Sequence, residues 1–128
     1  MKILGIDYGR KKIGLAVVDS QNKFSVPLKV IETTSWESQL KKIVESEEIQ
    51  KIVIGLPSGL MDFEIKKFGQ KLSRMVLVEV KYFDETLTSK EAQGLMIGLG
   101  KKAKARKKKE DAIAAAIMLQ LFIENFPS

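Results

Sequence analysis

The sequence predicts an α/β fold in which helices flank one mixed five-stranded sheet, within a single domain over residues 1–128. Two observations support this prediction. Three apolar, strand-like runs come first, and the short polar turns between them are typical of antiparallel neighbours. Helical and extended hydrophobic periods then alternate, which indicates strands reached through helical crossovers. The expected order is βββαβαβα, followed by a basic loop and a last helix.

The first three strands are expected at residues 2–8, 12–19 and 24–33. The first run, KILGIDY, carries apolar side chains on both faces, which predicts burial on both sides of the sheet. Gly5 within this run indicates close approach of a neighbouring element. Pro27 has no amide hydrogen to donate, so the third strand is expected at an edge of the sheet.

The later elements follow from changes in hydrophobic period. Thr34 and Glu37 have the spacing of a capping box, which predicts a helix start. KIVIGL reads as a short buried strand. These elements are expected at residues 34–48 (helix), 51–56 (strand), 61–73 (helix), 75–83 (strand), 88–99 (helix) and 110–125 (helix).

The chain contains no cysteine and no histidine, which excludes several kinds of chemistry. Disulfides, zinc–thiolate sites, Ser-His-Asp triads and HExxH zinc sites all need one of these residues. Oxygen ligands must therefore hold any metal ion, which favours a hard cation such as Mg²⁺ or Mn²⁺. No apolar run approaches the ~20 residues of a membrane span, and no secretory signal pattern opens the sequence. We expect a cytoplasmic protein with no membrane partner.

The positive charge of the chain is concentrated in one segment. The net charge is +6, and the run KKAKARKKK at residues 101–109 holds seven basic residues and no acid. Without this run, 15 basic residues face 16 acidic ones. A concentrated basic segment is the electrostatic signature of a polyanionic partner. A solvated loop that only aids solubility is an equally good interpretation of the run by itself.

Acidic residues follow two of the predicted strands and open the last helix. Asp7 ends the first strand, Asp84 and Glu85 end the fifth, and Asp111 begins the helix. If the two strands run in the same direction, their carboxyl ends share the edge at which open α/β sheets bind ligands. The small side chains of the alanines after Asp111 would let that helix approach closely. Converging carboxylates repel one another unless cations bind among them, and paired divalent ions are suited to phosphodiester chemistry.

Each acid also has a structural interpretation. Asp7 could cap the turn that contains Gly9. Asp84, Glu85 and Asp111 could be ordinary acids near helix N-termini, where the helix dipole favours negative charge. The combination of all of them, rather than any single acid, favours a metal site.

Four segments resemble the signature segments of the YqgF/RuvX family, at similar spacing over nearly the whole chain: DYGRKKIGLAVVD, IVIGLPSG, DETLTSKEA and RKKKEDAIAAAIMLQ. The first and last of them together are specific. The resemblance implies an RNase H-like fold, related to that of the RuvC Holliday junction resolvases. It also implies a hydrolase, a divalent-metal-dependent nuclease acting on structured nucleic acid. Members are described as Holliday junction resolvases and as nucleases that mature the 5′ end of pre-16S ribosomal RNA, a step of ribosome biogenesis.

By position, the resemblance implies Asp7, Glu85 and Asp111 as catalytic, metal-binding acids, with Asp84 a weaker candidate. The basic run matches a family loop rich in Lys and Arg, and the first turn is expected to face phosphate. The expected nucleic-acid contacts are Arg10, Lys11, Lys12, Lys104, Arg106, Lys107, Lys108 and Lys109.

The sequence departs from the family pattern at two places. Thr86 stands where the family has Arg, and a hydroxyl cannot grip phosphate as a guanidinium does. Arg10 or Lys11 could substitute. Phe63 follows Asp62 where the family favours Asp-Gly, which changes the loop rather than the metal site.

Two other functions compete with the nuclease. The first turn also resembles a phosphate loop of the actin and sugar-kinase superfamily, but that architecture needs two lobes and this sequence has one. A non-catalytic nucleic-acid-binding module would keep the fold and the basic run. The sequence leaves open whether the substrate is RNA or branched DNA, and whether the protein is a monomer or a homodimer.

Overall fold

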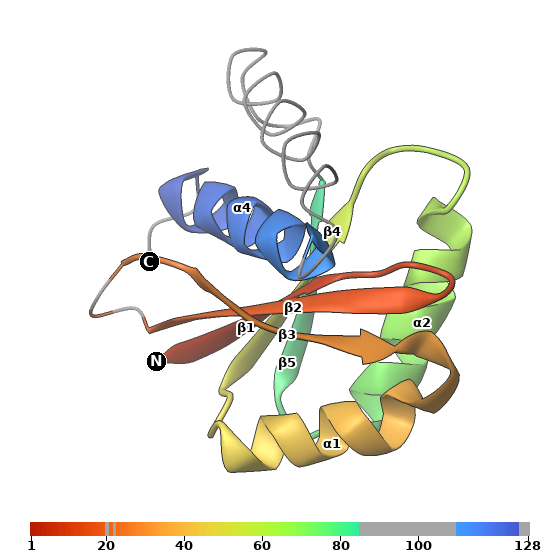
Figure 1. Cartoon of the computed structure of the whole chain (residues 1–128), viewed down its shortest axis with the longest axis horizontal. Coiled ribbons are helices and arrows are strands. Elements are labelled where there is room, and N and C mark those ends of the chain that lie inside the picture. Colours follow the sequence, from red (N-terminus) through yellow and green to blue (C-terminus); the bar gives the residue numbers. More distant parts are fainter. Residues whose placement is uncertain (20, 22, 85–109, 126–128) are drawn as a thin grey trace.

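In the computed structural model, the described residues are 1–19, 21, 23–84 and 110–125. Five strands form one sheet in the order β3-β2-β1-β4-β5 (Figure 1). Strand β1 pairs antiparallel with β2 and parallel with β4, while β2–β3 is antiparallel and β4–β5 parallel. The strands are β1 Lys2–Asp7, β2 Lys12–Asp19, β3 Val26–Glu32, β4 Lys51–Leu56 and β5 Glu79–Asp84. The predicted mixed five-stranded sheet is confirmed, with β3 at an edge.

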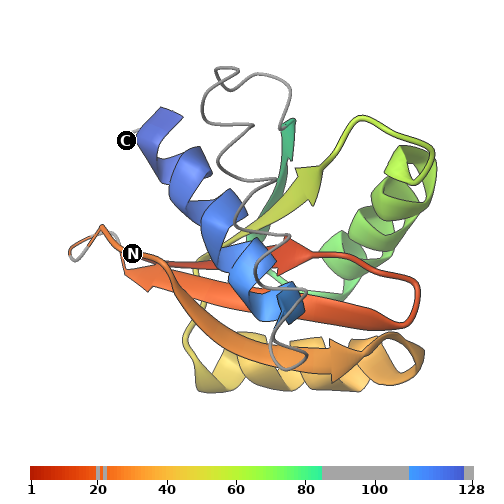
Figure 2. The same cartoon turned by 45° about the horizontal axis from the view of Figure 1, so that its top comes forward.

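Helices cover both faces of this sheet. Helices α1 (Trp36–Ser46) and α2 (Asp62–Met75) lie on one face, and α4 (Glu110–Asn125) crosses the other (Figures 1 and 2). A short 3-10 turn, Thr33–Ser35, precedes α1. None of the helices in the described part of the chain is long and apolar enough to cross a membrane.

Strand alternation divides the core into two clusters. Along β1, Leu4 and Ile6 join a cluster with α1 and α2, whereas Ile3 joins a cluster with α4. The α1/α2 side is larger and contains Trp36 and Phe68, whose rings lie 4.6 Å apart. The α4 side contains Val18, Val53, Phe83, Ala115, Met118, Leu119 and Phe122. Since buried side chains cover both faces of the central strands, the expectation of two-sided burial is confirmed.

Helix α4 packs closely against the sheet because the facing residues are small. A Cβ atom added at Gly5 would lie 2.9 Å from the Leu119 Cβ, closer than ordinary packing allows. Ala112, Ala115 and Ala116 of the helix are buried. This confirms the close approach expected at Gly5 and from the alanine-rich start of the helix.

Some predicted boundaries and one predicted cap are wrong. Strand β5 begins at Glu79 rather than at residue 75, because α2 continues to Met75 and its apolar end resembles a strand. The cap of α1 is Ser35, without a side-chain cap bond, since the 3-10 turn occupies the position of the predicted Thr34 capping box. The helix predicted at residues 88–99 lies outside the described residues.

Candidate active site

The carboxyl ends of β1, β4 and β5 lie at one edge of the sheet because these three strands are parallel. Asp7 ends β1 and Asp84 ends β5, opposite Leu56 at the end of β4. Figure 1 shows the connection from β4 to α2 leaving from this same edge. The geometry therefore brings the acid-bearing strand ends to the edge at which open α/β sheets bind ligands.

Asp7 and Asp111 lie on either side of the same glycine. Asp7 is the cross-strand partner of Gly14, and such partners point to the same face of the sheet. A Cβ atom at Gly14 would overlap the backbone carbonyl of Asp111. Asp7 and the start of α4 thus share one face and one edge of the sheet, and both acids are partly buried.

Asp84 belongs to the opposite face. The preceding residue, Phe83, is buried against α4, and alternation turns Asp84 toward the side of α1 and α2. There Asp84 Oδ1 accepts a 3.0 Å hydrogen bond from Ser58 Oγ in the β4–α2 connection. Ser58 has φ 61°, a left-handed conformation that is uncommon for a residue with a side chain. Asp84 is therefore tied to this connection rather than directed toward Asp7.

The remaining predicted ligand and most predicted basic contacts fall outside the described residues: Glu85, Lys104, Arg106, Lys107, Lys108 and Lys109. Thr86 lies in the same segment. Within the described ranges, no three acidic side chains gather closely enough to hold a metal ion. The structure thus brings Asp7 near Asp111, and the three-acid site stays a prediction.

The basic turn after β1 is exposed and anchored from two sides. Thr33 Oγ1 donates a 2.8 Å hydrogen bond to the Gly9 carbonyl, and the Thr33 amide donates one of 3.0 Å to Lys11. Arg10 Nε lies 3.3 Å from Glu64 Oε2 on α2. Sequence reasoning missed Thr33 and Glu64, because nothing in their local patterns indicates a partner so distant along the chain.

Tyr8 lies between Asp7 and this turn. Its ring packs 4.8 Å from that of Phe68, centroid to centroid. Burial raises the pKa of Tyr8 above 10.0, and the charge of Glu64 and a hydrogen bond with it raise this pKa further, against the opposing effect of Arg10. Tyr8, Arg10 and Glu64 thus form one small polar network next to the carboxyl end of β1.

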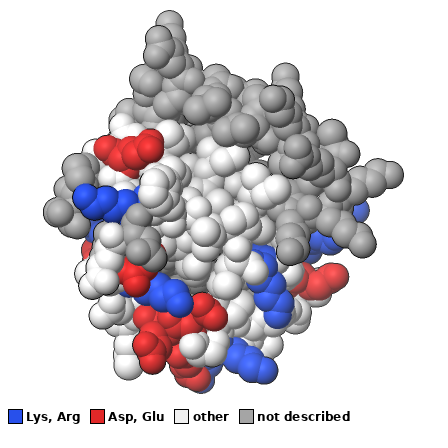
Figure 3. Space-filling view, turned by 60° about the vertical axis from the view of Figure 1, so that its left-hand side comes forward, with Lys and Arg blue, Asp and Glu red and all other residues white. Residues whose placement is uncertain are grey.

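Charge is balanced over the residues that the structure describes, where lysines and arginines equal the acids in number. The face in Figure 3 has a largely uncharged centre, with blue and red atoms intermingled in its lower part. The positive excess of the chain therefore arises entirely from the segment 85–109. Among the described residues, attraction to phosphate has to come from local groups such as the basic turn.

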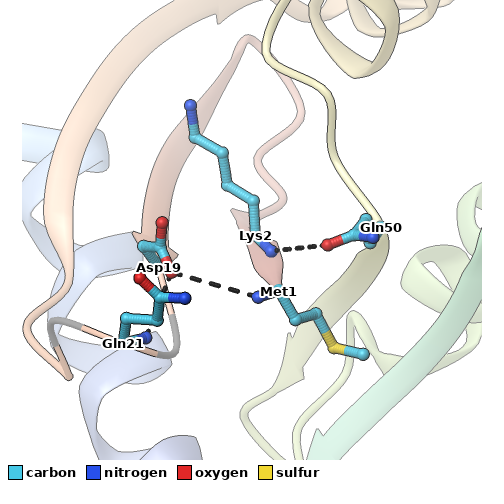
Figure 4. A network of polar contacts seen from close by, with 5 residues as sticks. All are labelled: Met1, Lys2, Asp19, Gln21 and Gln50. Carbon is cyan, nitrogen blue, oxygen red and sulfur yellow. Dashed lines mark hydrogen bonds and ion pairs between the residues drawn. The ribbon is translucent and has the colours of Figure 1, made fainter.

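Acidic residues at the opposite end of the strands, where β1 begins, have structural partners. Asp19 Oδ1 lies 3.9 Å from the terminal amine of Met1 and accepts a 3.1 Å hydrogen bond from the Gln21 amide (Figure 4). The Lys2 amide donates to Gln50, while the Lys2 ammonium pairs with Glu47 at 3.0 Å. These contacts hold the beginning of β1 in place, so the acidic residues at this end of the strands have a structural role.

The donor set at the Asp7 edge suits a hard divalent cation. Only oxygen ligands are available there, because the chain has neither histidine nor cysteine. Carboxylates are ligands that Mg²⁺ and Mn²⁺ prefer. Asp7 and Asp111 on one face of one strand end therefore fit such an ion, and a third acid on that face would complete the set.

A sequence model of the family described as "RuvX: Holliday junction resolvase" matches residues 1–125. The chain belongs to the RuvX family. A relative from Maridesulfovibrio salexigens, named "Putative pre-16S rRNA nuclease", is 36% identical, over 96% of this chain and 98% of the relative. A relative of the same name from Caldanaerobacter subterraneus subsp. tengcongensis is 32% identical, over 98% and 97%. This RuvX chain thus aligns with these two relatives over nearly their full length.

Solved structures agree on the fold of this RuvX protein. The structure of RuvC from Thermus thermophilus superposes with a TM-score of 0.60 at 13% identity, over 98% of this chain and 96% of that one. The fowlpox virus Holliday junction resolvase gives a TM-score of 0.57 at 17% identity, over 98% and 99%. At such identities the likeness shows an RNase H-like fold of the RuvC type, as the resemblance implied.

Proposed function

We propose that this RuvX-family protein is a divalent-metal-dependent nuclease that trims the 5′ end of pre-16S ribosomal RNA in the cytoplasm. The observation that carries the proposal is the placement of Asp7 and Asp111 around Gly14, at the carboxyl edge of the sheet. The relatives named as pre-16S rRNA nucleases support this choice of substrate.

Asp7, Asp111 and Glu85 are the proposed metal ligands. Phe83 of β5 is buried against α4. Glu85 lies outside the described residues and is proposed as a ligand on the sequence resemblance. Asp84 faces the other side and accepts a hydrogen bond from Ser58, which argues against it as a ligand. A bound divalent cation would neutralise phosphate charge and activate water for attack on phosphorus.

The basic side chains are proposed to hold and orient the substrate. Arg10 follows Asp7 by three residues, and its guanidinium is largely exposed although it pairs with Glu64. It is therefore our candidate for the phosphate contact that Thr86 cannot make. Lys11, Lys12 and the basic residues of the run 101–109 would attract the polyanion without reading its sequence.

Cleavage of four-way DNA junctions is the second candidate function, favoured by the description of the family. Symmetrical resolution needs two active sites and hence a homodimer, whereas trimming RNA is possible for a monomer. A non-catalytic binding module is the third candidate. Both alternatives predict a different outcome in the same cleavage assay.

The assay offers precursor 16S RNA and a synthetic four-way DNA junction side by side, with Mg²⁺ or Mn²⁺. We expect cleavage of the RNA, abolished by Asp7→Asn while binding is retained. Asp84→Asn is the matched control, since it makes the same chemical change on the opposite face and should leave cleavage largely intact. Preferential cleavage of the junction would support the resolvase, and equal cleavage by wild type and Asp7→Asn would exclude the proposed site. Binding without cleavage of either substrate would support the non-catalytic module.

A further inference from the structure

Two large apolar side chains stand in solvent where α2 begins. Leu60 is 101% exposed and Phe63 is 72% exposed, although the same helix buries Ile65, Phe68 and Leu72. Phe63 precedes Ile65 by two helical positions and so points away from the buried stripe. Covering the Phe63 ring with a partner would remove apolar surface from water, which is favourable.

A lysine one helical turn later lies over the Phe63 ring. Lys67 Nζ is 5.0 Å from the ring centroid, a cation–π arrangement between residues i and i+4. The exposed fraction of Phe63 leaves most of the ring accessible despite this contact. A flat aromatic surface beside a cation suits a partner that has both π-faces and negative charge.

The ring is connected to the candidate active site by short contacts. Glu64, the next residue along the chain, lies 3.3 Å from Arg10 in the basic turn that follows Asp7. In the connection just before the helix, Ser58 holds Asp84. The start of α2 therefore belongs to the same edge of the sheet as the proposed metal ligands (Figure 2).

The acids next to Phe63 have local partners. Asp62 Oδ1 accepts a 3.2 Å hydrogen bond from the Gly59 amide, and Glu64 pairs with Arg10. The cations Lys66 and Lys67 are exposed. This surface consequently offers a ring and positive side chains, which is the combination that binds single-stranded nucleic acid.

We propose that Phe63 is a stacking platform for an unpaired base of the nucleic-acid substrate, with Lys67 contacting an adjacent phosphate. The proposal rests on the nuclease function and specifies the substrate further, as one with unpaired nucleotides beside the cleavage site. Proteins that bind unpaired RNA stack its bases on aromatic side chains, and this contact tolerates any sequence because every base has a π-face. The resemblance described above implies glycine at this position, where this chain has Phe63.

The test measures binding of two RNA probes by the full chain at one salt concentration, with divalent ions chelated so that no cleavage occurs. One probe is a hairpin with an unpaired loop containing 2-aminopurine, and the other is a fully paired duplex. Phe63→Ala should weaken loop binding about 5- to 150-fold and abolish the quenching of 2-aminopurine. Duplex binding should change by less than about twofold, since phosphate contacts dominate it.

Two further variants separate stacking from general apolar contact. Phe63→Trp keeps a π-face and should retain loop binding, whereas Phe63→Leu keeps an apolar side chain and should behave like Phe63→Ala. The matched control is Phe24→Ala, because Phe24 is also largely exposed, at 75%. Phe24 follows the end of β2, where Asp19 is the strand partner of Lys2, so it lies at the opposite end of the strands from Asp7. This control variant should bind both probes like wild type.

Loop affinity that is unchanged in Phe63→Ala would overturn the stacking proposal, and so would full affinity in Phe63→Leu. Equal loss of loop and duplex binding would also overturn it. In each case, Mg²⁺-dependent cleavage that still requires Asp7 would leave the proposed nuclease function standing. If wild type binds neither probe and cleaves nothing, the nuclease function fails together with the stacking proposal.

Discussion

Gly14 of β2 and Asp111 of α4 are so close that a Cβ atom on the glycine would overlap the backbone carbonyl of the aspartate. Asp7 is the strand partner of that glycine. The missing side chain at position 14 thus creates the space in which the first turn of α4 comes down beside the end of β1. Packing and the proposed chemistry depend on the same contact.

Gly14→Ala should therefore lower both stability and cleavage. The added methyl group meets backbone rather than a flexible side chain, so the helix start must move, at an expected cost of about 1–3 kcal/mol of unfolding free energy. Cleavage should fall because Asp111 is displaced relative to Asp7. Denaturant titration and a cleavage assay measure the two effects.

Gly59→Ala is the control for this substitution. A Cβ atom at Gly59 would meet nothing within 4 Å, and its φ is not in the left-handed region. Alanine there should be neutral or stabilise by up to about 1 kcal/mol, through loss of entropy in the unfolded chain. Equal stability of the two variants would contradict the steric role of Gly14.

Ser58 should tolerate glycine better than alanine. Both substitutions remove the hydrogen bond to Asp84, but only glycine adopts φ 61° without strain. We expect Ser58→Gly to exceed Ser58→Ala in unfolding free energy by about 1 kcal/mol. The comparison needs only urea titrations of the two variants, and the reverse order would show that the left-handed backbone is not what constrains this position.

Neutralising Lys107, Lys108 and Lys109 to Gln should weaken binding to all nucleic-acid sequences. If each lysine contacts a phosphate, the slope of log affinity against log salt concentration should flatten by about 2 to 3. Gln at Lys29, Lys41 and Lys42 makes the same change in net charge at exposed positions on β3 and α1. An unchanged slope in the first variant, or equal flattening in both, would show that the basic run does not contact phosphate.

Stability should fall at alkaline pH, partly because of Tyr8. Burial, the charge of Glu64 and their hydrogen bond raise the pKa of this phenol above 10.0 in the folded state. A raised phenol pKa stabilises the fold below the unfolded pKa, and this contribution is lost as pH rises through the folded pKa. Tyr8→Phe lacks the titrating phenol, so only the wild type loses this contribution. The deficit of Tyr8→Phe, which is the amount by which its unfolding free energy falls below that of wild type, should therefore become smaller between about pH 8 and pH 11.

The same reasoning applies to Tyr82→Phe, because burial also raises the pKa of Tyr82. Its deficit should narrow over the same pH range. A deficit of Tyr8→Phe that stays constant would show that Tyr8 ionises equally readily in the folded and unfolded states, and one that widens would show that it ionises more readily in the folded state.

Hydrophobic patterns predict the strands with strong alternation or burial, because the order of side chains along such a strand reflects which of its faces are buried. Strands at residues 12–19 and 51–56 and the helix at 110–125 have the expected bounds. The start of β5 was wrong, since an apolar run does not show where a helix ends and a strand begins. The spacing of Thr34 and Glu37 predicts a cap at Thr34, but the chain forms a 3-10 turn there.

The candidate site was predictable only in part. Asp7 and Asp111 could be placed at one edge because strand direction and helix order determine where each acid lies. The separation of Asp84 from them depends on Phe83 facing α4 and on the hydrogen bond from Ser58. Such tertiary contacts leave no periodic signal in the sequence. The pairing of Glu64 with Arg10, 54 positions apart, was missed for the same reason.

Helix α4 completes the second core although it comes last among the described elements. While the chain is being synthesised, the surface around Gly5 and Phe83 has no cover until residues 110–125 leave the ribosome, a delay on the order of seconds. In the proposed site, Asp7 belongs to the first strand to be synthesised and Asp111 to the last described helix. Until helix α4 has been synthesised and has packed against the sheet, Asp7 lacks the segment that carries Asp111, so the proposed site is assembled late.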